Sequence, residues 1–455
     1  MIPQTTIDLF SKYAKSGPRY TSYPTAPAFA PVSQQDIITQ FALHHDDDAP
    51  LSVYVHIPFC QSLCWYCGCT TVITRNNGQA DIYLDYLERE LELRTQYQNF
   101  DRKVEQMHWG GGTPTFLSPD QIRRLGNTLN SFFTFTDDAE IRVEIDPRTA
   151  DESHIKALRD IGFNQASIGV QDTHDDVQKA IHRVQSMDEN RQIMDWLRKY
   201  DFTALNVDLI YGLPLQNDEK FQETIDDVLT LDPDRLALFN YAHVPWMKPS
   251  QKLLQVDDMP GTNEKIQILL NAHHRLTKEG FHAIGLDHFA KPDDALSVAH
   301  KQGKLQRNFQ GYSTQDGVEI LGLGMSSISQ APWGYYQNEK SLPDYKHMIE
   351  NGELPIIKSY ELDRDDHIRR HTIMRLMCDM QLKWDEIDAE FCINSRKYFS
   401  EEIEQLTPFE KDGLITIDEN GFYCTTFGQL LVRNIAMLFD AHLQKMREQR
   451  FSKTV

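Results

Sequence analysis

Cys60-Gln-Ser-Leu-Cys64-Trp-Tyr-Cys67-Gly-Cys69 is the stretch around which this chain is organised, and it holds four of the seven cysteines. It follows directly after the strand-like run 51–56. Three thiolates at the spacing Cys-x3-Cys-x2-Cys can hold one cubane iron–sulfur cluster, because iron–sulfur centres select soft thiolate ligands. A cubane has four irons, so three cysteines leave one iron open to bind and activate a small molecule. We therefore predict that Cys60, Cys64 and Cys67 ligate a 4Fe-4S cluster.

A zinc site and a disulfide group are the alternatives for these cysteines. A tetrahedral zinc site usually takes two short Cys or His pairs that are well separated, whereas here all the sulfurs form one group and no second pair follows. A disulfide group would need an oxidising compartment, and residues 1–8 lack the basic and apolar regions of a secretory signal. Because Cys378, Cys392 and Cys424 lie far apart, we predict a reduced, cytoplasmic protein with one cysteine-built cofactor site.

The composition bounds the number of domains and the kinds of partner. A chain of 455 residues is too long for one small core, so two or three domains are expected. Its 25% charged and 40% hydrophobic residues are ordinary for a globular protein, and no apolar run of about 18 residues predicts a membrane span. The net charge of −21 argues against nucleic acid as the main partner. An anionic substrate would need a local basic pocket.

From residue 51 onward the pattern of a strand, a loop and a helix repeats. The expected strands are 51–56, 104–109, 140–145, 165–170, 205–210 and 235–240. The expected helices are 81–97, 118–132, 151–160, 187–200 and 218–231, of which the second opens with the capping-box spacing Ser118 to Gln121. Strands that alternate with helices favour a parallel sheet that curls into a complete or partial barrel, with its chemistry at the carboxyl ends of the strands.

The two ends of the chain differ from this middle part. Residues 1–50 include the stretch 17–25, whose prolines and tyrosines predict a stiff, extended strap, either packed over the main domain or carrying Arg19 to an active-site mouth. After Ile328 the repeating pattern ends, and residues from about 360 onward predict helices, the last over 428–447, together with a short extended pair. We interpret this end as a lid. The predicted domains are 1–50, 51–355 and 356–455.

Several polar residues fall where the predicted strands end. Glycines in the run 108–115 permit close backbone approach and leave N–H groups for a ligand carboxylate. Glu144, Gln171, Asn206 and Asp208 also lie at strand ends, where a carboxylate inside a barrel is costly without a partner. Each residue alone is about as well explained by structural hydrogen bonding. As a set they favour a ligand site.

The cysteine motif, with the aromatic Tyr66 before its third cysteine, resembles the signature of the radical S-adenosylmethionine (radical SAM) enzymes. The glycine run resembles the same superfamily's Gly-Gly-Thr-Pro element. The resemblance implies a six-unit open barrel, an open iron that chelates the amino and carboxylate groups of S-adenosylmethionine, and cleavage of that molecule to a 5′-deoxyadenosyl radical. The protein's share of such chemistry is binding, orientation and exclusion of water.

Longer strings narrow the resemblance to the family of oxygen-independent coproporphyrinogen III oxidases, nearly end to end. The strings are Gly17–Thr25, Tyr54–Cys60, Asp208–Pro214, Phe239–Pro245, Asp287–Ala290, Arg307–Tyr312 and Leu323–Ser329. The resemblance implies oxidative decarboxylation of the ring A and B propionates of coproporphyrinogen III to vinyl groups, with two S-adenosylmethionine molecules bound. A haem-binding chaperone is the alternative, since relatives of that kind share the cluster loop, but they typically lack the strap and the second cysteine of Cys-Gly-Cys.

The family's motifs assign roles residue by residue. Contacts to the first S-adenosylmethionine are expected from Tyr54, Gly111 and Glu144. Contacts to the second are expected from Tyr66, Gly112, Thr113, Gln171, Arg183, Asp208, Ala242 and Ile328. Arg19, Gln310 and the pair Asp287-His288 are candidates for binding the substrate, because an arginine pairs well with a propionate.

Cys69 is an awkward fourth ligand for the same cluster because one residue separates it from Cys67. We interpret it as a neighbouring thiol and a candidate catalytic residue. The resemblance further implies an electron donor such as flavodoxin or ferredoxin, and we expect a monomer that binds neither membrane nor nucleic acid.

Overall fold

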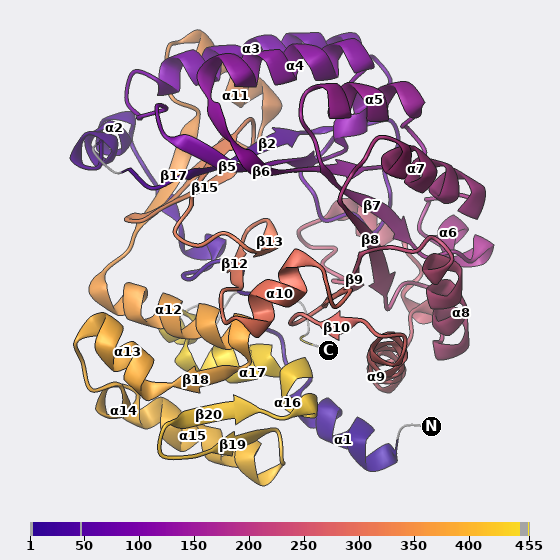
Figure 1. The fold of residues 1–455 in the computed structure, drawn as a ribbon, viewed down its shortest axis with the longest axis vertical. Helices are drawn as coiled ribbons and strands as arrows, with labels where there is room; N and C mark the ends of the chain where they lie inside the picture. Colours follow the sequence, from indigo (N-terminus) through magenta and orange to yellow (C-terminus); the bar gives the residue numbers. More distant parts are fainter. Residues whose placement is uncertain (1–2, 46–47, 446–453, 455) are drawn as a thin grey trace.

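The computed structural model describes residues 3–45, 48–445 and 454, and a large curved sheet forms the centre of the molecule (Figure 1). Six of its strands lie side by side, parallel and in chain order. They are β2 (Leu51–Ile57), β5 (Lys103–Gly111), β6 (Thr134–Ile145), β7 (Gln165–Gln171), β8 (Ala204–Tyr211) and β9 (Arg235–Asn240). All six predicted strands are therefore confirmed, although β6 begins earlier than expected.

Helices cover the outer side of these strands, one after each strand (Figure 1). They are α3 (Gly78–Arg94), α4 (Pro119–Phe132), α5 (Glu152–Asp160), α6 (Asp175–Ala180) with α7 (Met187–Lys199), α8 (Asp218–Leu229) and α9 (Thr262–Lys278). The capping box expected at Ser118 and Gln121 is present, with proline in the first turn. The short helix α6 was not expected. The open six-unit (β/α) barrel predicted from the sequence is confirmed.

The sheet continues beyond both ends of the barrel, which keeps the barrel open. On one side β14 (Glu319–Leu323) pairs in parallel with β2 and leads into the antiparallel strands β15 (Ile328–Ala331), β16 (Gly334–Asn338), β17 (Ile356–Glu361) and β1 (Ala30–Pro31). On the other side β11 (His288–Ala290) and β10 (His282–Ala283) follow β9. These short strands have no clear signal in the sequence and were not predicted. The predicted domain boundary between residues 355 and 356 stays a prediction. Strand β17 begins directly after it and pairs with this sheet.

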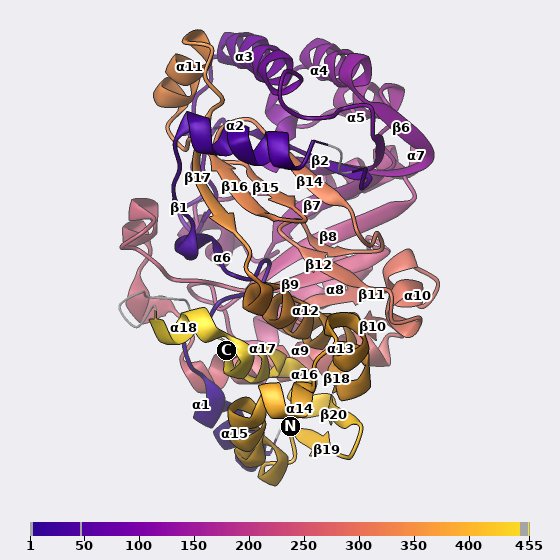
Figure 2. The same ribbon diagram turned by 90° about the vertical axis from the view of Figure 1, so that its left-hand side faces the viewer.

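The N-terminal segment consists of a strap between two helices. Helix α1 (Gln4–Tyr13) lies beside the C-terminal part of the chain, and α2 (Gln34–Leu43) lies near β17, where Gln34 Nε2 donates to Leu354 O at 2.7 Å (Figure 2). Between them, residues 14–33 hold only a short 3-10 turn and strand β1. The extended strap predicted over 17–25 is present, and the two helices are additions to it.

The C-terminal part is mainly helical, with a small antiparallel sheet β18-β20-β19 (Figure 2). Its elements are α12 (Arg364–Asp379), β18 (Gln381–Lys383), α13 (Trp384–Phe391), α14 (Ser395–Tyr398), α15 (Ser400–Lys411), β19 (Ile415–Ile417), β20 (Gly421–Cys424), α16 (Thr426–Leu430), α17 (Val432–Ala436) and α18 (Ala441–Lys445).

The single helix predicted over 428–447 is wrong within the described residues, because the chain forms several short helices there; residues 446 and 447 lie outside the described part. Asp440 explains the last break. It is extended, and its carboxylate accepts the backbone N–H groups of His442 and Leu443 at 2.9 Å, which starts a new helix as an N-cap does.

In the described ranges, no helix is long and apolar enough to cross a membrane.

Candidate active site

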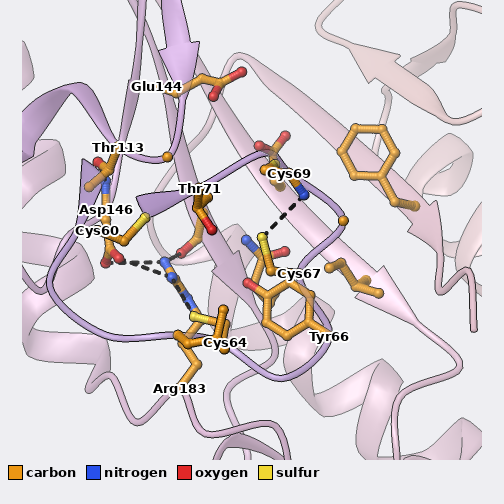
Figure 3. Close-up of a pocket in the computed structure, with 18 of the residues that line it drawn as sticks. Cys60, Cys64, Tyr66, Cys67, Cys69, Thr71, Thr113, Glu144, Asp146 and Arg183 are labelled. Atoms are coloured by element: carbon orange, nitrogen blue, oxygen red, sulfur yellow. Dashed lines mark hydrogen bonds and ion pairs between the residues drawn. The ribbon is translucent and has the colours of Figure 1, made fainter. Parts of the chain in front are cut away.

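A cavity of about 490 Å³ opens at the carboxyl ends of the barrel strands (Figure 3). It brings together most of the residues predicted from the sequence. These are Arg19, Cys60, Cys64, Tyr66, Cys67, Cys69, Gly111, Gly112, Thr113, Glu144, Gln171, Arg183, Asp208 and Ala242. Residues from the strap, the cysteine loop and several strand ends thus line one space.

The cysteine loop is held as a closed unit between β2 and α3. Its two ends pair as the short parallel strands β3 (Phe59–Cys60) and β4 (Val72–Ile73). Neighbouring units hold its backbone: Trp65 N donates to Ile181 O at 3.0 Å, and Gln251 Nε2 donates to Tyr66 O at 2.9 Å. Lys248 Nζ donates to the carbonyl oxygen of Cys69 at 2.9 Å. The thiols are therefore positioned by the protein itself.

Two arginines and one carboxylate surround Cys64. Arg148 Nη2 lies 3.4 Å and Arg183 Nη1 3.7 Å from the Cys64 sulfur. Both guanidinium groups also bind Asp146, at 2.6 Å from Arg148 Nη2 and 3.1 Å from Arg183 Nη1. Burial by itself raises the pKa of Asp146, but Arg183 and Arg148 outweigh it and hold that pKa at about 2. The carboxylate is ionised at neutral pH and fixes both cations beside the thiol.

The thiols differ in acidity because their surroundings differ. Burial raises the pKa of the Cys60 thiol to about 12. A hydrogen bond from Cys69 lowers the pKa of Cys67 to about 6, and the Cys69 N–H lies 3.4 Å from the Cys67 sulfur. These values describe the protein without a cofactor, and cluster ligation requires all three thiols as thiolates.

The donor set fits a polynuclear cluster. Across the described residues, no three His, Cys, Asp or Glu side chains gather closely enough to hold one metal ion. Three separate soft thiols instead border a cavity with two cations beside them, which suits an anionic thiolate-ligated cluster. The buried Nε of Arg183 also has no hydrogen-bond partner within residues 3–45, 48–445 and 454. The site therefore has an open donor as well as ligands, as cofactor binding requires.

The glycine run carries Glu144 into the same cavity. The Glu144 carboxylate accepts the Gly111 N–H at 3.3 Å and contacts His108 Nε2 at 3.1 Å. Burial opposes ionisation of Glu144, but His108 and the Gly111 N–H lower its pKa overall. Gly111 has a φ of +116°, and a Cβ on Gly112 would lie 2.6 Å from backbone oxygens of the cysteine loop. An ionised carboxylate at this place can receive the amino group of a bound ligand.

Asp208 is a second, half-buried carboxylate in the cavity. Burial and the charge of Glu144 raise its pKa to about 6, although Ser167 and Asn206 donate to it at 3.0 and 2.7 Å. Asn206, which was predicted to lie at a strand end of the ligand site, thus acts by orienting Asp208.

The mouth of the cavity is formed partly by the strap. Arg19 Nη2 donates to the carbonyl oxygen of Asn240 at 2.8 Å, and its Nη1 lies 3.6 Å from Asp287. The guanidinium also lies over the ring of Phe239. Asp287 binds His288 Nδ1 at 2.7 Å. Arg19 and the pair Asp287-His288, both predicted as substrate candidates, are therefore brought together.

Besides Asn206, Asp287 and His288, which contact lining residues, Tyr54, Gln310 and Ile328 are predicted residues that do not line the cavity. The Tyr54 hydroxyl forms a hydrogen bond with His56 Nδ1 at 3.1 Å, and the Tyr54 ring stacks on His108. Gln310 bonds Ser52 at the opposite end of β2, and Ile328 packs beside Tyr335. The cofactor and substrate roles proposed for these residues stay predictions.

Sequence reasoning assigned no role to several lining residues. Polar and aromatic members of this group include Asp146, Arg148, Ser167, Phe239 and Gln251. Asp146 lies two residues after Glu144 and therefore on the same face of the strand, and this alternation is the sequence signal that could have identified it as a site residue. The others have no local pattern that marks them, because their partners come from other units.

Comparisons with known proteins agree with this site. Residues 54–228 match the radical SAM superfamily, and residues 362–431 match the HemN C-terminal domain. Oxygen-independent coproporphyrinogen III oxidases from Pseudomonas aeruginosa and Escherichia coli K12 are each 44% identical, over 98% of this chain and 98% of theirs.

A solved structure described as coproporphyrinogen III oxidase (HemN) from Escherichia coli, a radical SAM enzyme, has a TM-score of 0.89 and 43% identity. The match covers 93% of this chain and 97% of that one. The identity, the coverage and the shared fold point the same way as the cysteine-lined cavity. The chain belongs to the oxygen-independent coproporphyrinogen III oxidase family of the radical SAM superfamily.

Proposed function

We propose that this chain decarboxylates the ring A and B propionates of coproporphyrinogen III to vinyl groups without oxygen, giving protoporphyrinogen IX. One observation carries the proposal: three cysteines, the glycine run and Glu144 line a single cavity in a chain that matches such enzymes along nearly its whole length. The cofactors are a 4Fe-4S cluster, ligated by Cys60, Cys64 and Cys67, and S-adenosylmethionine, with a second molecule beside the first.

The bound cofactors supply a 5′-deoxyadenosyl radical, and the chain's residues prepare the site for it. Asp146 keeps Arg148 and Arg183 at Cys64, where their charges offset the negative charge of the thiolates. Glu144 is held ionised, so it can bind an ammonium group, and backbone N–H groups of the glycine run can bind a carboxylate. The strap narrows the mouth at Arg19 and thereby limits the entry of water.

The mouth has the chemistry needed for a propionate. Arg19 is the cation of the strap that lines the cavity, and its position over Phe239 leaves it between an apolar surface and the carboxylate of Asp287. A substrate propionate can replace part of the interaction with Asp287 and place its β-carbon toward the cavity. Each vinyl group then requires the loss of one β-hydrogen atom, CO2 and one electron, so an electron acceptor is also needed.

In this proposal the protein works as a monomer in the cytoplasm. It receives electrons from a flavodoxin or ferredoxin. Cysteines that serve as cluster ligands must remain reduced until the cluster is built, which favours a reducing compartment.

An anaerobic assay with reductant, S-adenosylmethionine and coproporphyrinogen III tests the function. Chromatography is expected to show protoporphyrinogen with about two 5′-deoxyadenosines per product, since each vinyl group needs one hydrogen abstraction. Deoxyadenosine without a porphyrin product would reject this substrate. The alternative of a haem-binding chaperone is not favoured, and tight binding in a haem titration together with no product would revive it.

A further inference from the structure

A second cavity, of about 320 Å³, lies between the sheet and α12 and shares no lining residue with the cysteine-lined cavity. Its walls come from β12 (Gln306–Asn308), the loop before β14, strands β15 and β16, α12 and the end of α13. It therefore lies where the barrel sheet meets the C-terminal part. None of its residues takes part in the function proposed above.

One face of α12 supplies two of the three arginines that line this second cavity, together with two histidines whose pKa is lowered by burial. His367, Arg370, His371 and Arg375 follow the spacing that places side chains on the same side of a helix. Arg375 is already paired, with Asp379 at 3.4 Å and with the carbonyl oxygen of Gly303 at 3.2 Å. Arg370 is different. Its guanidinium lies over the ring of Tyr335, and within the described ranges it forms no ion pair or hydrogen bond.

Arg307 adds a buried cation with one unused donor. Its side chain is only 8% exposed. Nε donates to the carbonyl oxygen of Tyr20 at 3.2 Å and Nη2 to that of Arg19 at 3.3 Å, whereas the buried Nη1 has no hydrogen-bond partner among the described residues. A buried charged donor without an acceptor is costly, so an acceptor is expected when the site is filled.

In the part of the chain that the structure describes, the carboxylates that line this cavity form no ion pair with Arg370 or Arg307; Asp287, whose pKa Arg307 helps to lower, does not line it. Asp316 and Glu390 are the acidic residues that line it, and both are exposed at its edge, where solvent screens them. The cations lie deeper than the carboxylates. In a chain whose net charge is −21, this arrangement creates a local site for negative charge.

We propose that the second cavity binds an oxyanion, a carboxylate or phosphate group held between Arg370 and Nη1 of Arg307. Its volume is near the lower limit of ligand pockets, so it fits a small anion or one arm of a larger ligand. Arginine suits both groups because its planar fork binds two oxygens at once.

The bound oxyanion stabilises the strap. The same guanidinium of Arg307 that receives the anion holds the backbone of Arg19 and Tyr20, and Arg19 lines the mouth of the cysteine-lined cavity. An acceptor at Nη1 fixes this guanidinium in place and so favours the position of the strap that the structure shows.

Titration calorimetry of the full, anaerobically purified protein with inorganic phosphate and with propionate tests the proposal. We expect saturable binding of at least one probe, weakened about tenfold or more by Arg370→Gln because one charged, forked donor is lost. Arg370→Met, which keeps the packing over Tyr335, is expected to behave in the same way. Arg191→Gln removes an exposed arginine of α7 and serves as the matched control with unchanged binding.

Hydrogen exchange of residues 17–25 adds an independent readout. Phosphate is expected to slow exchange there in the unmodified protein and to have no effect in the folded Arg370 variants. The proposal is wrong if neither probe binds, if both Arg370 variants bind as well as the unmodified protein, or if exchange of the strap does not respond.

Competition distinguishes the two sources of the oxyanion. If coproporphyrin III displaces phosphate, the group is a propionate of the substrate, an assignment that rests on the proposed function. If both bind together, the site takes a free oxyanion. Phosphate binding needs no catalysis, so it would persist if the decarboxylation assay failed.

Discussion

Arg433 of α17 donates from Nη2 to the carbonyl oxygen of Gly17 at 2.6 Å, which joins two residues that are 416 positions apart in the sequence. Its Nε donates to the carbonyl oxygen of Pro18 at 3.1 Å. Arg307 holds the next two carbonyl oxygens, those of Arg19 and Tyr20. The strap is therefore fixed through its backbone by two buried arginines from different parts of the chain.

Arg433→Gln is expected to release the strap. The substitution removes a buried cation and leaves carbonyl oxygens without donors, so we expect a loss of stability of about 2–4 kcal/mol and faster protease cleavage within residues 14–25. Arg198→Gln is the matched control, because Arg198 also donates to backbone carbonyls, those of Leu231 and Asp232, but lies far from the strap in sequence. Equal cleavage rates in the two variants would contradict the anchoring role.

Cys64→Ser is expected to abolish both cluster assembly and S-adenosylmethionine cleavage, because a serine hydroxyl is not the soft ligand that the cluster needs. The iron content and the visible absorption of the purified protein measure the first effect, and 5′-deoxyadenosine measures the second. Cys392→Ser changes an exposed cysteine outside the cavity and is the control. Full cleavage activity in Cys64→Ser would overturn the cluster assignment.

Cys69→Ser is expected to separate the cluster from the later chemistry. Both the side chain and the backbone N–H of residue 69 contact Cys67; serine keeps the backbone N–H and offers a hydroxyl in place of the thiol. Cluster absorption is therefore expected to remain, while the yield of protoporphyrinogen falls if Cys69 is catalytic. Loss of iron comparable to that of Cys64→Ser would instead make Cys69 a ligand.

Asp146→Asn is expected to change stability in a way that depends on pH. The folded pKa of about 2 lies below the ordinary value of 3.8, so the folded protein favours the ionised form. This contribution, about 2 kcal/mol, is present above pH 4 and is lost as the pH falls toward 2. The unmodified protein should therefore lose more stability than the variant over that range.

Urea unfolding of both proteins between pH 2 and pH 7 measures this difference. At pH 7 the variant is expected to be less stable by about 3 kcal/mol or more, because Arg148 and Arg183 lose a buried partner. Subtracting the variant's free energy of unfolding from that of the unmodified protein at each pH cancels the contribution of the other carboxylates that titrate at low pH. Curves that stay parallel from pH 7 to pH 2 would show that Asp146 has an ordinary pKa.

The parts of the fold that could be predicted are those with local signals. The six barrel strands are short runs that are apolar throughout or at every second residue, and the caps of the following helices are local as well, as at Ser118. The strands β14 to β17 escaped prediction because they are short and owe their stability to neighbours such as β2. The helix predicted over 428–447 breaks because Asp440 caps a new helix and accepts the hydroxyl of Tyr20, a distant contact.

The same limit applies to the site. The cysteine motif and the glycine run are contiguous, so their spacing identifies them in the sequence. The group around Cys64 is assembled from separate parts of the chain. Arg148 follows strand β6, whereas Arg183 lies shortly after helix α6. A pair of arginines that share one carboxylate leaves no periodic trace in the sequence.

Gly112→Ala is expected to disturb the base of the cysteine loop. A methyl group there would lie 2.6 Å from the backbone oxygens of Pro58 and Phe59. Those atoms cannot rotate away as a side chain could, because Gly112 N–H donates to Ile57 O at 2.8 Å and Thr113 N–H to Phe59 O at 2.9 Å. Overpacking of this kind costs about 1–3 kcal/mol.

The expected result is lower stability together with less iron per chain, since the loop that carries Cys60 must shift. Gly261→Ala is the control, because a Cβ at Gly261 meets no atom within 4 Å and its φ of −66° is ordinary. Urea unfolding and iron analysis of the two variants decide the question. If Gly112→Ala kept both its iron and its stability, the glycine run would not be the support on which the cysteine loop rests.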